Sequence, residues 1–175
     1  MKFTRPVSAQ PPHRTGQPFL RHRRKDGFTL VEIMIVVVIV GVLAALALPS
    51  VQLVRENSRN AAVMNDIRVF ANAFTAYHLE SGEWPADRNP GLFPPEMDGW
   101  LSPNRFTRET PLGGNYDWDP ESSGSKPADA TAVVTVRGYT VPDSQIVRLL
   151  DRYDDGSADT GRIRSSGGNL FYIIE

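Results

Sequence analysis

The residues from Phe28 to Leu48 form an apolar run of 21 residues in which only Thr29 and Glu32 are polar. As an α-helix, which rises about 1.5 Å per residue, the run spans roughly 31 Å and matches the hydrocarbon core of a bilayer. Its valine and isoleucine content would also suit a buried strand, but no turn signal divides it into strand-sized pieces. We therefore predict a membrane-spanning helix over residues 28–49.

Charge is distributed unevenly about Gly27. Residues 1–27 carry seven basic side chains and one acidic side chain, whereas the remaining residues carry twelve basic and nineteen acidic ones. Because basic flanks are retained in the cytoplasm, this distribution predicts a single pass with the N-terminus cytoplasmic and the C-terminal part exported. A basic arm that binds nucleic acid is the alternative. The apolar run directly after the arm argues against it, and we expect no nucleic-acid partner.

Three kinds of targeting segment fit this arrangement. A secretory signal peptide would be cut after its apolar run, at the small residues Ala45 to Ala47. An uncleaved signal anchor would retain the whole helix. A third kind of leader, residues 1–27, would be removed by a cut in front of the apolar run, after Gly27.

Glu32 favours the third kind. A carboxylate within an apolar helix costs roughly 2.5–3.5 kcal/mol at the bilayer centre and less near the interface, and a signal peptide or plain anchor gains nothing from it. Cleavage after Gly27 would create an α-amino group at Phe28, four residues before Glu32. The two opposite charges would then share the first helical turn, and the amine of a neighbouring subunit could take the same place.

The stretch KDGFTLVEIMIVVVIVGVLAALALP, residues 25–49, resembles the class III signal of type IV pilins and type II secretion pseudopilins. In that signal a glycine and a phenylalanine precede Thr-Leu-hydrophobic-Glu and an apolar helix. The resemblance implies that prepilin peptidase cuts after Gly27. It also implies that Phe28 becomes the N-methylated first residue and that Glu32 acts in assembly.

The resemblance implies a structural subunit and not an enzyme. A type II secretion pseudopilin, extracted from the bacterial inner membrane by an assembly platform, would join copies of itself and other pseudopilins in a short periplasmic filament. A type IV pilin of a surface filament, for adhesion, motility or DNA uptake, is the alternative. The absence of cysteine favours the pseudopilin, because a cysteine pair closes the C-terminal region of many pilins. A membrane-tethered or secreted binding domain or enzyme behind a conventional signal is the alternative of another class.

The helix changes character at Pro49, where a proline removes one backbone donor and clashes with the preceding turn. We expect Pro49 to interrupt the helix and the segment Gly41–Pro49 to bend or partly unwind. Beyond it, apolar residues recur at spacings of four and three and predict an amphipathic helix over residues 50–82. The expected buried stripe is Val63, Ile67, Phe70, Phe74 and Tyr77. Charged residues, among them Asp66, are expected on the other faces.

Residues 83–175 predict an exported α+β region with the amphipathic helix as its spine. The elements expected there are an irregular loop over Trp84–Thr110, strands around Asn115–Trp118 and Thr131–Tyr139, a short helix after Pro142 and a closing hairpin around Gly167 and Gly168. The predicted fold class is therefore α+β, with a long N-terminal helix, membrane-spanning in its first half and amphipathic in its second, packed on a small antiparallel sheet as in pilins.

The sequence shows little sign of catalytic chemistry. His78 is the only histidine beyond the leader, and there is no cysteine, nucleophile motif or phosphate-binding loop. One acidic cluster offers the hard oxygen ligands that calcium prefers: Asp151, Asp154, Asp155 and Asp159. Major pseudopilins carry a calcium site in a C-terminal loop, so the resemblance implies calcium here and no other cofactor. A solvated acidic turn after the helix is the alternative.

Overall fold

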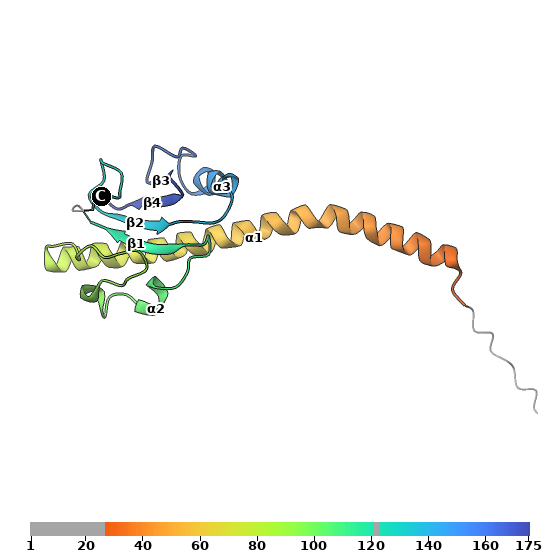
Figure 1. Cartoon of the computed structure of the whole chain (residues 1–175), viewed down its shortest axis with the longest axis horizontal. Helices are drawn as coiled ribbons and strands as arrows, with labels where there is room; N and C mark the ends of the chain where they lie inside the picture. Colours follow the sequence, from red (N-terminus) through yellow and green to blue (C-terminus); the bar gives the residue numbers. More distant parts are fainter. Residues whose placement is uncertain (1–26, 121–122) are drawn as a thin grey trace, which may run out of the picture. The chain divides into compact units, whose positions relative to one another are not determined.

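The computed structural model describes residues 27–120 and 123–175, and it divides the chain into two compact units, Met1–Leu43 and Ala44–Glu175. Except for Gly27, the predicted leader lies outside the described residues. The elements, labelled in Figure 1, are α1 (Leu30–Ser81), a single 3-10 turn (Pro95–Met97), α2 (Pro103–Phe106), β1 (Asn115–Asp119), β2 (Val133–Arg137), α3 (Asp143–Tyr153), β3 (Ile163–Ser166) and β4 (Asn169–Ile173).

The helix α1 is long and apolar enough to cross a membrane, and its most apolar stretch is exposed along its whole length. It remains helical through Gly41 and Pro49. The expectation that Pro49 interrupts the helix is therefore wrong for this structure. A proline deletes a single backbone donor, and membrane-spanning helices tolerate that loss where neighbouring groups pair the freed backbone atoms. Unwinding of this segment in an assembled filament stays a prediction.

The second unit contains a four-stranded antiparallel sheet with the order β1-β2-β4-β3. Alternate side chains of its strands point inward, and Tyr116, Val136 and Leu170 lie in register across three of them. These side chains pack with the buried stripe of α1, in which Val63, Ile67, Phe70 and Phe74 are fully buried. The predicted fold class, a long helix packed on a small antiparallel sheet, is confirmed.

Aromatic contacts join three layers of this unit. The ring of Phe74 stacks on Trp118 with a centroid distance of 3.9 Å. The rings of Phe70 and Tyr116 form a T-shaped pair with a centroid distance of 4.8 Å, and the centroid of Phe70 lies 5.2 Å from that of Phe106 at the end of α2. The stripe of α1 is thus covered by the sheet on one side and by the segment containing α2 on the other (Figure 1).

Asp66 lies in this core, only 2% exposed, and the expectation that it faces away from the buried stripe is wrong. Its carboxylate accepts hydrogen bonds from Arg105 at 2.8 Å, Arg108 at 2.5 Å and the hydroxyl of Tyr116 at 2.8 Å. Burial alone would raise the pKa of Asp66, but the hydrogen bonds from these three partners hold it below its ordinary value. The cluster ties α1 to the α2 segment and to β1.

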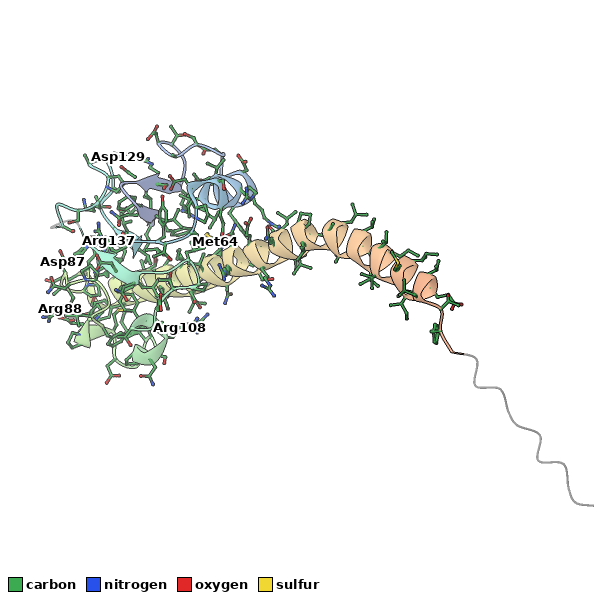
Figure 2. All side chains as sticks on the ribbon, turned by 45° about the vertical axis from the view of Figure 1, so that its right-hand side comes forward. Met64, Asp87, Arg88, Arg108, Asp129 and Arg137 are labelled. Atoms are coloured by element: carbon green, nitrogen blue, oxygen red, sulfur yellow. The ribbon has the colours of Figure 1, made fainter. Side chains whose placement is uncertain are left out.

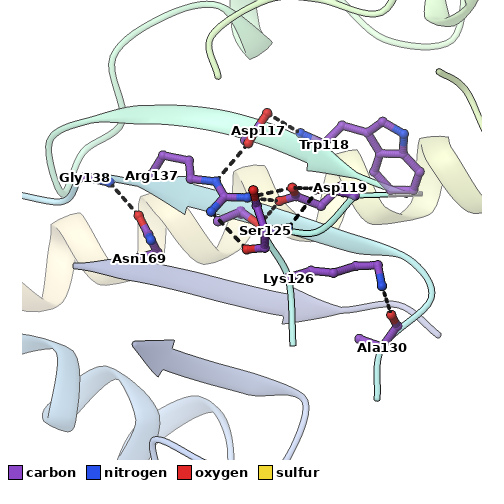
Figure 3. Close-up of polar contacts among 11 residues, drawn as sticks. Asp117, Trp118, Asp119, Ser125, Lys126, Ala130, Arg137, Gly138 and Asn169 are labelled. Atoms are coloured by element: carbon purple, nitrogen blue, oxygen red, sulfur yellow. Dashed lines mark hydrogen bonds and ion pairs between the residues drawn. The ribbon is translucent and has the colours of Figure 1, made fainter. Parts of the chain in front are cut away.

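A second buried charge cluster lies on the outer face of the sheet (Figure 3). The guanidinium of Arg137 donates to Asp117 at 2.9 Å and to both oxygens of Asp119 at 2.6 and 2.8 Å. It also donates to the carbonyl oxygen of Ser125 at 3.1 Å, which ties Ser125 to this face. Burial raises the pKa of Asp117 to about 6, although the hydrogen bond from Arg137 opposes the shift.

Candidate functional site: the amino-terminal motif

The amino-terminal motif consists of Gly27, Phe28, Thr29 and Glu32, and its geometry is set by the start of α1. Thr29 is the residue before the first helical position, Leu30, and its hydroxyl accepts a hydrogen bond from the backbone amide of Glu32 at 3.2 Å. In return, one carboxylate oxygen of Glu32, Oε2, accepts from the backbone amide of Thr29 at 2.8 Å. This reciprocal pair is a capping box, which satisfies two backbone donors that the helix itself leaves unpaired.

A third hydrogen bond, from the hydroxyl of Thr29 to the same oxygen of Glu32 at 2.9 Å, closes the box. The other carboxylate oxygen, Oε1, makes no hydrogen bond within residues 27–120 and 123–175. Glu32 can therefore cap its own helix and still accept a second donor. The capping box was not among the sequence predictions, although the pattern Thr-x-x-Glu before an apolar run is its usual signature.

Gly27 and Phe28 precede the helix, and the side chain of Phe28 is 81% exposed. A Cβ atom added to Gly27 would meet no atom within 4 Å. Nothing in the described part of the chain therefore requires a glycine at this position. An exposed, non-helical peptide bond between Gly27 and Phe28 suits a proteolytic site, where the need for glycine would come from the protease.

The predicted pairing of Glu32 with the α-amino group of Phe28 stays a prediction, because Phe28 follows Gly27 in this chain and carries no free amine. What the structure contributes is the orientation of the carboxylate. The capping box fixes Glu32 in the first turn of α1, where a carboxylate also meets the positive end of the helix dipole.

The acidic loop, residues 154–162, follows α3, and its aspartates accept hydrogen bonds from the loop itself and from the start of β3. Asp154 accepts from the backbone amide of Ile163 at 2.6 Å. Asp155 accepts from the backbone amide of Ser157 at 2.9 Å and from the hydroxyl of Thr160 at 2.7 Å. The two aspartates thus shape the connection between α3 and β3.

Two of the four predicted calcium ligands converge in the structure. Oxygens of Asp154 and Asp155 lie 2.2 and 2.9 Å from the position that a Cβ atom would occupy on Gly161, which has a positive φ of 77°. Asp151 instead approaches Gly156, and no group of three or more acidic or histidine side chains comes close enough to hold a metal among the described residues. The carboxylates alone do not form a ready-made calcium site, and calcium binding stays a prediction.

His78 has a packing contact in this structure. Its ring stacks on Trp84 with a centroid distance of 4.1 Å and an interplanar angle of 5°. Trp84 in turn packs against Trp118, whose indole nitrogen donates to the carbonyl oxygen of Pro85 at 3.0 Å. These contacts pack His78, near the carboxyl end of α1, against the segment that follows the helix, and they pack that segment against β1.

Comparison with known proteins places the motif in context. The sequence profile described as "Prokaryotic N-terminal methylation motif" matches residues 22–48 and so includes Gly27, Phe28 and Glu32. A type II secretion system core protein G from Klebsiella michiganensis is 32% identical over 110 residues, which cover 55% of this chain and 75% of that protein.

Type IV pilins are also similar to this chain. The type IV major pilin protein PilE1 of Neisseria gonorrhoeae is 40% identical over 77 residues, covering 42% of this chain and 35% of that protein. Among solved structures, the major type IV pilin PilA1 from Clostridium difficile aligns with a TM-score of 0.45 and 18% identity, over 68% of this chain and 96% of that one.

Proposed function

The chain belongs to the family of type II secretion pseudopilins and type IV pilins, and we propose that this structural subunit acts as a pseudopilin in a short periplasmic filament that drives protein export. The observation that carries the proposal is the exposed apolar surface at the start of α1. Such a surface is stable only when lipid or other apolar helices cover it. A subunit that is stored in a membrane and then packed into a filament core meets this requirement in both states.

Processing is the first step of the proposed function. The basic leader holds the amino terminus on the cytoplasmic side of the bacterial inner membrane, and the exported part reaches the periplasm. Prepilin peptidase then cuts between Gly27 and Phe28, which lie exposed in front of the helix. The Thr29–Glu32 capping box lies wholly beyond the cut, so the helix keeps its cap after cleavage.

Assembly is the second step. An assembly platform in the inner membrane extracts the subunit, and its apolar helix packs against those of other copies and other pseudopilins. The free oxygen of Glu32 would then accept the methylated amine of Phe28, from the same chain or a neighbour. A subunit out of register would bury an unpaired carboxylate, which costs several kcal/mol in an apolar core.

The similarity to the core protein G of Klebsiella michiganensis favours a pseudopilin over a surface pilin, because it extends over three quarters of that protein, whereas the similarity to PilE1 covers 35% of the pilin. A filament subunit acts through assembly, and we propose no catalytic role for this chain.

The mass of the mature amino terminus tests the processing step. We expect an amino-terminal peptide that begins with N-methylated Phe28. A peptide beginning at Leu48 would show an ordinary secretory signal, and an intact Met1 would show a plain membrane anchor. Either result would refute the proposal.

A further inference from the structure

The uncharged surface of α1 continues past Pro49. No charged residue occurs from Ile33 to Val54, a length of 22 residues that spans roughly 33 Å as a helix. Val51, Leu53 and Val54 are each about half exposed or more. The exposed, uncharged surface thus extends to Val54, and Arg55 is the first charged residue after it. If a bilayer covers this surface, Arg55 lies at the membrane interface on the periplasmic side.

Arg55 and Arg59 lie four residues apart on α1 and so on one face of the helix. Both are exposed, and neither forms an ion pair within residues 27–120 and 123–175. The neighbouring acid, Glu56, is already neutralised by Arg148 of α3 at 2.5 Å. The two arginines therefore keep their positive charge available for an outside partner.

A small pocket of about 230 Å³ opens beside these arginines. It is lined by Gln52, Arg55, Glu56, Arg59, Pro142 and Gln145. The wall formed by α3 is fixed, because the buried amide of Gln145 donates to Asn60 of α1 at 2.8 Å. The pocket thus combines two unpaired cations with a rigid wall at the end of the uncharged span.

We propose that Arg55 and Arg59 bind the phosphate group of an anionic phospholipid at the periplasmic surface of the membrane. The inference rests on the proposed insertion of α1 in the membrane, and it places the far end of the span at Val54, five residues beyond the boundary at Pro49 predicted from the sequence. Guanidinium groups bind phosphate through paired hydrogen bonds, and their long stems can lie along apolar surface while the charge reaches the headgroups. Together with the lipid-embedded helix, this contact would fix the depth of the stored subunit.

Lipid selectivity of the full chain tests the inference. The wild-type protein, R55Q/R59Q and the control R88Q are reconstituted in vesicles of equal parts phosphatidylcholine and phosphatidylglycerol. Spin-labelled lipids then report the association of each lipid class with the protein. Arg88 lies beyond the carboxyl end of α1 (Figure 2) and pairs only loosely with Glu96, at 3.9 Å. The basic leader is common to all three proteins, so it contributes equally to their selectivity.

We expect the preference for phosphatidylglycerol to fall about two- to fivefold in R55Q/R59Q at low salt, while R88Q stays like the wild type. Equal preference in all three proteins, or an equal fall in R88Q, would overturn the inference. Inorganic phosphate is added at constant ionic strength as a further arm. We expect phosphate to lower the preference for phosphatidylglycerol no more than chloride does. A larger loss with phosphate would show that the arginines bind small anions and not a lipid headgroup.

Extraction of the vesicles at alkaline pH separates this inference from the proposed function. If the wild-type protein remains in the membrane and R55Q/R59Q has the same preference for phosphatidylglycerol, the headgroup contact alone is contradicted. Wild-type protein that is released would contradict the membrane span itself, and the headgroup contact with it.

Discussion

The backbone amide and the hydroxyl of Thr29 both donate to the same oxygen of Glu32, at 2.8 and 2.9 Å. Glu32 is therefore part of the helix start as well as a charge near the membrane. Loss of assembly in a variant without this carboxylate could come from either property. The two are separable, because glutamine can replace glutamate in a capping box but carries no charge.

We predict that E32Q and E32A both insert in the membrane and that neither assembles efficiently. E32Q keeps the capping box and loses only the charge that would pair with the amine of Phe28. Filaments sedimented from cells that contain the assembly machinery measure assembly, and alkaline extraction measures insertion. T29S is the matched control, since it keeps both the hydroxyl and the carboxylate, and it should assemble normally. Normal filaments from E32Q would show that the cap, and not the charge, is what assembly needs.

Removal of the buried charge of Asp66 should destabilise the second unit. D66N leaves Arg105 and Arg108 without their carboxylate, and we expect the free energy of unfolding to fall by about 2–3 kcal/mol. Chemical denaturation of the full chain in detergent, followed by tryptophan fluorescence, measures the change. In E96Q, where the pair with Arg88 is long and partly exposed, the loss should stay below about 0.5 kcal/mol. Equal losses in both variants would contradict a special role for the Asp66 cluster.

The fold class could be predicted from sequence because its signals are local. The apolar span, the stripe from Val63 to Phe74 and the glycine turn at Gly167 each depend on neighbouring residues. The resulting helix and hairpin match α1 and the β3–β4 pair.

The burial of Asp66 could not be predicted in this way, because its partners lie 39 to 50 residues further along the chain. Nothing near Asp66 in the sequence distinguishes it from an exposed acid on an amphipathic helix. The continuity of α1 through Pro49 is a property of the whole helix. The proline removes one backbone donor, while the helical residues on both sides, from Leu30 to Ser81, keep the chain in a single helix. The capping box, by contrast, has a local signal, because Thr29 and Glu32 stand three residues apart at the start of the apolar run.

Asp117 should make the unfolding free energy depend on pH in a direction opposite to that of aspartates whose folded pKa is lowered by ion pairs and hydrogen bonds. Its folded pKa of about 6 lies above the value of about 4 expected in the unfolded chain, so the folded state binds the proton more tightly. The linked stabilisation is complete below about pH 4 and is lost as the pH rises through about 6. D117N cannot titrate and should lack this component.

Denaturation of the wild-type chain and D117N at a series of pH values between about 4 and 7 tests this expectation. We expect the stability of the wild type relative to D117N to fall by on the order of 2 kcal/mol across this window. Asp66 contributes in the opposite sense, because its lowered pKa makes its stabilisation disappear only as the pH falls through its folded value. A constant difference between the two proteins would show that Asp117 has an ordinary pKa.

Calcium binding by the acidic loop is predicted from the resemblance to pseudopilins. An ion near Gly161 would find oxygens of Asp154 and Asp155 and would need further ligands from backbone carbonyls, water or a rearranged Asp159. A bound calcium ion would compete with two hydrogen bonds: the one that Asp154 accepts from the backbone amide of Ile163 and the one that Asp155 accepts from the hydroxyl of Thr160.

Calorimetric titration and thermal unfolding of the full chain measure this binding. A calcium concentration of one hundred times the dissociation constant should stabilise the protein by about 2.7 kcal/mol, which raises the melting temperature by roughly 5–11 °C. D155N should abolish the rise, whereas D98N, an acidic residue outside the loop, should preserve it. Magnesium should bind more weakly because it requires a compact octahedral site and dehydrates reluctantly. A flat titration with no change in melting temperature would refute calcium binding and leave the loop as an internally hydrogen-bonded connection between α3 and β3.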